Sequence, residues 1–235
     1  MDRKLKNRVI FWAALVMLCF IAGTGAGCLE LQKNLDVVGK GSIVSFDAVM
    51  KAIPDNVAAD EVNGGWSLLA PDGSVRFIWG DNFSRTPLYD VMLEFDAAPF
   101  LKAGLDPEKL PEQFVFFEDR LMVGRNLGDD ALEYSEEKTP LAAFEQIVDK
   151  KRDSIGYHAQ FDHYGVDVGN GNMFEWAKDM RVNDKDIVFV LEPEPFVSAG
   201  VSPEAVDGWL FAKVTVKVGG KMAEVDKFLK PFDLQ

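Results

Sequence analysis

Cysteine is almost absent from this chain of 235 residues. Both of its cysteines, Cys19 and Cys28, lie near the N-terminus, so residues 29–235 contain no thiol. This absence excludes a disulfide, a zinc–thiolate site and a cysteine nucleophile from that part of the chain. Histidine is equally scarce, because His158 and His163 are the only two in the sequence.

The short motifs of several enzyme classes are also missing. The sequence has no Gly-x-Ser-x-Gly, no phosphate-binding loop, no dinucleotide-binding fingerprint and no His-Glu-x-x-His. We therefore predict that the protein has no cofactor, no bound metal and no catalytic residue belonging to these classes.

Basic residues are too few to balance the acidic ones. The chain has 25 lysines and arginines against 38 aspartates and glutamates, and residues 1–27 hold four of the basic residues and one acid. The remaining 21 basic and 37 acidic residues give residues 28–235 a formal charge of −16. A body this acidic argues against binding to nucleic acid or to anionic lipid headgroups.

The N-terminus has the pattern of an export signal. A basic start precedes the apolar run 9–22, and the small residues of 23–27 follow before the second cysteine. The ending Ala26-Gly27-Cys28 resembles the cleavage site of bacterial lipoproteins, and the resemblance is confined to this segment. It implies that Cys28 becomes the lipid-bearing first residue of the mature protein and that the lipid attaches the protein to a membrane.

Two other interpretations of the N-terminus remain open. The apolar run with its small residues is almost long enough to stay as an uncleaved spanning helix. A secreted form, cut near Ala26, is the other alternative. All three interpretations predict an extracytoplasmic location for the rest of the protein.

One stretch of the sequence occurs twice. Residues 90–110 and residues 186–206 align without a gap and share the string Pro-Phe-x-x-Ala-Gly-x-x-Pro-Glu. In each copy a short, nearly continuous apolar run predicts a strand buried on both faces. The first proline and the glycine predict the start and the end of a short helix, and the second proline predicts another helical turn.

The residues around each copy extend the repeat. Each half of the chain has the pattern of a helix, a hairpin, a strand, short helices and a final strand. This order predicts an α+β fold with an internal duplication, in which helices pack on an antiparallel or mixed sheet. The predicted divisions are a signal peptide or membrane anchor (1–27), a spacer (28–41), a first repeat (42–125), a connector (126–139), a second repeat (140–220), and a C-terminal helix and tail (221–235).

The two histidines are the first candidates for chemistry. Residues 157–168 are predicted as one strand that contains both histidines. Because they are five residues apart in that strand, their rings are expected to point to opposite faces of a sheet. That geometry disfavours a shared metal site and favours ordinary hairpin residues. The alternative is acid–base chemistry by His158 or His163 with the neighbouring Asp162.

Aromatic residues on the two predicted hairpins are the second group of candidates. Strand alternation places some of them on a second face of the sheet, where they line a groove if that face is open and form core if helices cover it. The candidate binding residues are Trp66, Trp79, Tyr164, Trp176, His158 and His163.

Together these features predict a lipid-anchored extracytoplasmic protein that binds a small ligand or an envelope protein without catalysis. Its ligand would occupy a cleft between the repeats or the aromatic face of the hairpins. One alternative is an envelope hydrolase that uses a histidine with Asp162. The other is a structural component of the envelope.

Overall fold

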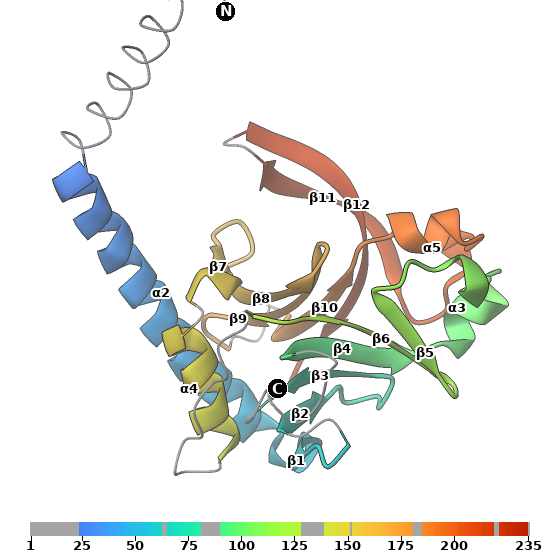
Figure 1. Ribbon diagram of the computed structural model, residues 1–235, viewed down its shortest axis with the longest axis horizontal. Helices are drawn as coiled ribbons and strands as arrows, with labels where there is room; N and C mark the ends of the chain where they lie inside the picture. The colour runs from blue at the N-terminus through green and yellow to red at the C-terminus, as the bar shows by residue number, and fades with distance from the viewer. Residues whose placement is uncertain are drawn as a thin grey trace, which may run out of the picture. The chain divides into compact units, whose positions relative to one another are not determined.

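Two antiparallel sheets of six strands each dominate the fold (Figure 1). The computed structural model describes the backbone of residues 24–62, 65–80, 90–127, 139–150, 152–180, 185–218 and 221–234. Side chains are described from Val38 onward, except at positions 150, 217 and 218. The chain divides into two compact units, Met1–Val38 and Gly39–Gln235, and both sheets belong to the second.

The first sheet is built from the first half of the chain. Its strand order is β1-β2-β3-β4-β6-β5. The central strand β4 is buried on both faces over its first five residues, as its apolar sequence predicts. The strands are β1 (Val57–Ala59), β2 (Trp66–Leu69), β3 (Val75–Trp79), β4 (Val91–Asp96), β5 (Phe114–Phe117) and β6 (Arg120–Arg125).

The second sheet repeats this order with the second half of the chain. Counted from β7, its strands run β7-β8-β9-β10-β12-β11, which is the order of the first sheet. The strands are β7 (Ile155–His158), β8 (His163–Gly169), β9 (Asn172–Ala177), β10 (Ile187–Leu191), β11 (Leu210–Val218) and β12 (Lys221–Phe232). Strands β11 and β12 are long and arch over the sheet (Figure 1). Gln160, in the turn between β7 and β8, donates a hydrogen bond from its Nε2 to Thr215 O of β11 at 2.6 Å. The sheet therefore curves into a half-barrel.

Helices are few and mostly short. Those in the first half are α2 (Thr24–Ala52), η1 (Pro54–Asn56), α3 (Ala98–Lys102) and η2 (Pro107–Lys109). Those in the second half are α4 (Pro140–Lys150), η3 (Arg152–Ser154), α5 (Glu194–Ser198) and η4 (Pro203–Ala205). Both α3 and α5 have a proline in their first turn, as the repeated string predicts.

The predicted α+β class is wrong, because the described chain is mostly β. The single final strand predicted for the first half is instead the two strands β5 and β6, separated by a turn in which Glu118 has a φ of 53°. Residues 221–230, predicted as a helix, belong to β12, which pairs with β10 and with β11. Hydrogen bonding to strands on both sides therefore outweighs the helical spacing of apolar residues in this segment.

The two copies of the repeated string lie against each other. The Asp106 N–H donates to Ala199 O and the Ser202 N–H donates to Ala103 O, both at 2.9 Å. The donors occupy matching positions in the two copies, and so do the acceptors. This reciprocity places an approximate twofold axis between the strings.

Aromatic rings from matching positions meet across the same axis. The ring centroids lie 4.2 Å apart for Phe46 and Phe144, 4.6 Å for Phe77 and Phe174, and 4.8 Å for Phe100 and Phe196. All six side chains are fully buried. The core between the two similar halves is therefore an aromatic interface to which both helices and strands contribute.

Most of the N-terminal prediction lies outside the described residues. Residues 1–23 are not described, and of Cys28 only the backbone is, within α2. In the part of the chain that the structure covers, no helix combines the length and the apolar character that crossing a bilayer requires.

Candidate functional site

The aromatic candidates lie mainly in the core. Trp79 and Trp176 are fully buried, and their indole N–H groups donate to Pro140 O at 3.0 Å and to Ser45 Oγ at 2.9 Å. Tyr164 is buried and Trp66 is half-buried. The two fully buried tryptophans pack against Phe46 of α2 and Phe144 of α4, so they are part of the core instead of lining an open groove.

The structure brings the two histidines together on one face. They lie directly opposite each other on β7 and β8, because residues 159–162 form the turn of a hairpin. The prediction that their rings point to opposite faces is therefore wrong. Asp162 has a φ of 52° in that turn and accepts a hydrogen bond from the Tyr157 hydroxyl.

Glu175 of β9 is the carboxylate beside the histidines. Its Oε1 lies 2.9 Å from His158 Nδ1, and its Oε2 lies 3.7 Å from His163 Nδ1. A Cβ on Gly165 would lie 3.5 Å from His158 Cε1 and 3.2 Å from Glu175 Cγ, so the glycine leaves room for the pair. Among the described residues, no group of three or more acidic, histidine or cysteine side chains is arranged to hold a metal ion.

The histidine–glutamate pair shifts both pKa values. The hydrogen bond with Glu175 raises the pKa of His158, although partial burial opposes the shift. Burial alone would raise the pKa of Glu175, but His158 and His163 together outweigh it and hold that pKa below its usual value. The pair therefore favours the state in which His158 is charged and Glu175 is ionised.

We expect this pair to make stability depend on pH. Because the folded pKa of His158 is raised, its contribution is present below its ordinary pKa of 6.5 and is lost as pH rises through the folded value. Because the pKa of Glu175 is lowered, its contribution is present above 4.5 and is lost as pH falls through the folded value. The free energy of unfolding, measured by urea denaturation at a series of pH values, should fall less steeply above pH 6.5 for His158→Gln than for wild type. Equal slopes for variant and wild type would contradict a stabilising contribution from charged His158.

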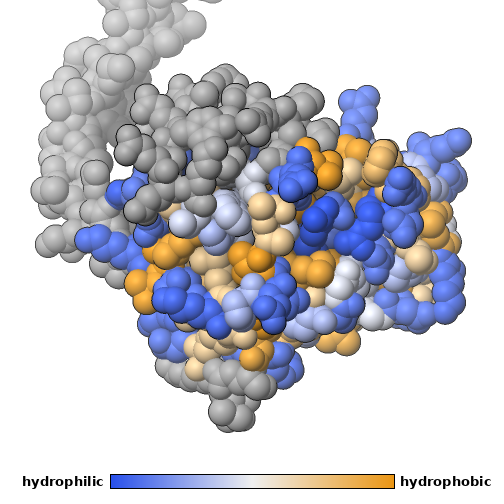
Figure 2. Space-filling model, turned by 90° about the horizontal axis from the view of Figure 1, so that it is seen from below, coloured by the Kyte–Doolittle hydropathy of each residue, from blue (hydrophilic) through white to orange (hydrophobic). Residues whose placement is uncertain are grey.

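Surface hydropathy by itself does not mark a site. On the face shown in Figure 2, hydrophobic and hydrophilic residues are interspersed. Scattered apolar residues of this kind are normal on a protein surface. A pocket with polar groups at defined positions is a stronger indication of binding.

Such a pocket lies where the two halves meet. It has a volume of about 380 Å³, and we call it the junction pocket. Asp72, in the turn between β2 and β3, comes from the first half, whereas the other lining residues come from the second half. The lining residues are Asp72, Gly208, Trp209, Leu210, Lys230, Pro231 and Phe232.

Lys230 of β12 is the cation of the junction pocket. Its side chain is 9% exposed, and its Nζ lies 2.9 Å from Asp72 Oδ2 and donates to Gly208 O at 3.0 Å. The same Nζ lies 5.8 Å from the ring centroids of Trp209 and of Phe232. A largely buried ammonium group is therefore held by a carboxylate, a backbone carbonyl and two aromatic rings.

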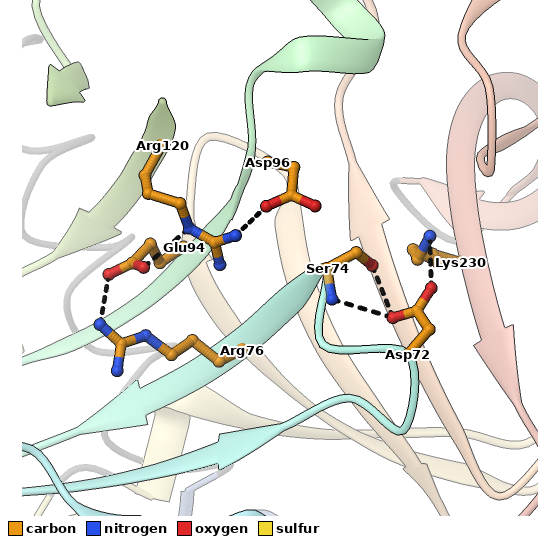
Figure 3. Close-up of polar contacts among 7 residues, drawn as sticks. All are labelled: Asp72, Ser74, Arg76, Glu94, Asp96, Arg120 and Lys230. Atoms are coloured by element: carbon orange, nitrogen blue, oxygen red, sulfur yellow. Dashed lines mark hydrogen bonds and ion pairs between the residues drawn. The ribbon is translucent and has the colours of Figure 1, made fainter. Parts of the chain in front are cut away.

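Asp72 is fixed from its own turn as well as by Lys230. Its Oδ1 accepts from the Ser74 hydroxyl at 2.6 Å and from the Ser74 N–H at 3.0 Å (Figure 3). Burial tends to raise the pKa of Asp72, but the bonds from Ser74 and Lys230 outweigh it, so the pKa is lowered. The pocket therefore contains a preorganised pair of opposite charges.

A second group of charges lies on the first sheet (Figure 3). Glu94, on β4, pairs with Arg76 at 2.7 Å and with Arg120 at 2.9 Å, and Arg120 also pairs with Asp96. Glu94 is 8% exposed, so the two arginines neutralise a nearly buried carboxylate. We interpret this group as structural, because each acid in it has a basic partner.

The junction pocket could not be predicted from the sequence. Asp72 is not among the candidate residues of the sequence, and Lys230 belongs to the segment predicted as a C-terminal helix. The available signal was weak: a lysine next to Pro231 and Phe232 in an otherwise apolar run. The burial of Lys230 depends on the pairing of β12, which no local pattern specifies.

No protein-family model, no curated protein and no solved structure matches this chain.

Proposed function

We propose that this protein is a lipid-anchored extracytoplasmic binding protein whose small ligand occupies the junction pocket. The lipoprotein-like ending at Cys28 supports the anchor. The observation that carries the binding function is the pocket itself, in which a fixed Lys230–Asp72 pair lies beside aromatic and aliphatic side chains. Small-molecule sites typically combine an apolar lining with a few polar groups of this kind.

The chemistry of the pocket favours binding over catalysis. None of its seven lining residues, all within the described chain, is a histidine, serine, threonine or cysteine. The two charged groups neutralise each other at 2.9 Å. The lining therefore offers no hydroxyl, thiol or imidazole group for covalent hydrolysis.

The hydrolase alternative has to use other residues. The His158–Glu175 pair supplies an imidazole hydrogen-bonded to a carboxylate. The carboxylate beside the histidine is Glu175 and not the predicted Asp162, whose carboxylate accepts a hydrogen bond from Tyr157. This alternative stays a prediction, as does a structural role in the envelope.

The anchor is tested by replacing Cys28 with alanine. We expect wild-type protein extracted from membranes to have the intact mass of the chain from Cys28 plus lipid, and Cys28→Ala to be lost from the membrane fraction. The matched control is Cys19→Ala, which removes a thiol from the apolar run and should leave the mass shift and the retention intact. An unprocessed Met1 end with retention in Cys28→Ala would instead establish an uncleaved anchor.

A further inference from the structure

We infer that the ligand of the junction pocket is an uncharged ring with adjacent hydroxyl groups, such as the sugar unit of a glycan. This inference rests on the proposed function and adds the chemical class of the ligand. Three properties of the pocket carry it: its balance of charge, its unused hydrogen-bonding capacity and its apolar lining.

The charges in the pocket are balanced without a ligand. Lys230 supplies the one basic side chain of the lining and Asp72 the one acidic side chain, 2.9 Å apart. A charged ligand would lie beside a like charge or would have to separate this pair. Separation is costly because Ser74 also holds Asp72 through two hydrogen bonds. The pocket therefore favours an uncharged ligand.

The paired groups retain capacity for a ligand that both donates and accepts. An ammonium group has three N–H donors, and Lys230 directs two of them to Asp72 and Gly208. Asp72 Oδ2 has a further lone pair, and its side chain is 43% exposed. A hydroxyl group is both donor and acceptor, so two adjacent hydroxyls can accept from Lys230 and donate to Asp72 together.

The rest of the lining suits the non-polar face of a ring. Leu210, Pro231 and Phe232 present aliphatic and aromatic surface, and Trp209 lies beneath the lysine. Leu210 is 58% exposed although its side chain is apolar. A sugar ring has C–H groups on its faces and hydroxyls around its edge, so it can contact this surface while it bonds to the charged pair.

The test uses the full-length protein in detergent, labelled with 5-fluorotryptophan. The ¹⁹F resonance of Trp209 is assigned with Trp209→Phe and followed during titration with four probes. These are methyl glucopyranoside, glucuronate, glucosamine and cyclohexanol, which share a six-membered ring and differ in charge and hydroxyl groups. We expect saturable binding of methyl glucopyranoside, with the other three at least about tenfold weaker.

Two substitutions locate the binding. Asp72→Asn should weaken methyl glucopyranoside about tenfold, because the hydroxyl loses a charged acceptor. Leu210→Asp should weaken it by a similar factor, and its exposed position preserves folding if Asp72→Asn is unstable. The matched control is Asp207→Asn, an exposed aspartate paired with Lys102 outside the pocket, which should leave affinity unchanged.

The outcomes separate the two levels of the proposal. Tighter binding of glucuronate, glucosamine or cyclohexanol than of the glucoside would overturn the inferred ligand class and leave the junction pocket as a binding site. A Trp209 resonance that responds to none of the four probes would overturn the inference and count against the proposed function. Equal affinities in wild type, Asp72→Asn and Leu210→Asp would place the binding elsewhere and overturn both.

Discussion

Replacing Gly104 with alanine should destabilise the protein by about 2–5 kcal/mol. Gly104 has a φ of +107°, and an added Cβ would lie 2.7 Å from the backbone carbonyl oxygen of Gly200. The positive φ costs about 1–2 kcal/mol for a residue with a Cβ, and overpacking against rigid backbone adds about 1–3 kcal/mol. The free energy of unfolding from urea denaturation measures the effect.

Gly73 provides the matched control. It also has a positive φ, +74°, but an added Cβ would meet nothing within 4 Å. Gly73→Ala should therefore show only the conformational cost of about 1–2 kcal/mol. Gly200→Ala should behave like Gly104→Ala, because its Cβ would lie 2.9 Å from Gly104 O. If Gly104→Ala and Gly73→Ala lose the same stability, the close contact between the two strings is not part of the folded protein.

Replacing Glu94 with alanine should cost about 3 kcal/mol. Removing this nearly buried carboxylate leaves Arg76 and Arg120 without their shared partner, and their side chains are only 27% and 21% exposed. Breaking a buried ion pair from one side costs about 3–5 kcal/mol, and the partial exposure of the arginines places the expected value at the lower end. Urea denaturation again provides the measurement.

Two further variants show that the loss comes from buried charge. Glu94→Gln keeps the shape and one acceptor oxygen, so its loss should be smaller than that of Glu94→Ala. Asp207→Ala removes the acid of an exposed pair with Lys102 and should change stability little. Comparable losses for Glu94→Ala and Asp207→Ala would show that the charges on the first sheet are solvated and contribute little.

Local sequence patterns predicted the strand and the glycine conformation of each repeated string correctly. The apolar runs of β4 and β10 are buried strands, and Gly104 and Gly200 have the positive φ expected after a short helix. These features depend on residues near one another in the chain, where proline, glycine and hydrophobic runs have direct conformational effects.

The fold class and the site depend on contacts that are distant in sequence. The Gly104–Gly200 contact joins residues from different halves of the chain. The local sequence therefore predicted the positive φ of each glycine, but it did not predict that the two glycines lie against each other. The histidines face the same way only because a turn separates β7 from β8. Lys230 is buried only because β12 is a strand between β10 and β11. Local spacing cannot distinguish these arrangements from the alternatives that it also fits.

The reciprocal hydrogen bonds between the strings give the molecule the geometry of a homodimer whose two subunits are joined in one chain. In a true homodimer every substitution appears twice, and the two halves must change together. Here each half can change alone. Pairing with β4 and β10 makes Val123 the counterpart of Lys230, and Val123 is a fully buried apolar residue. A cation thus lies on one side of the axis at the position where the other side has hydrophobic packing, so the core does not contain a second copy of this charge.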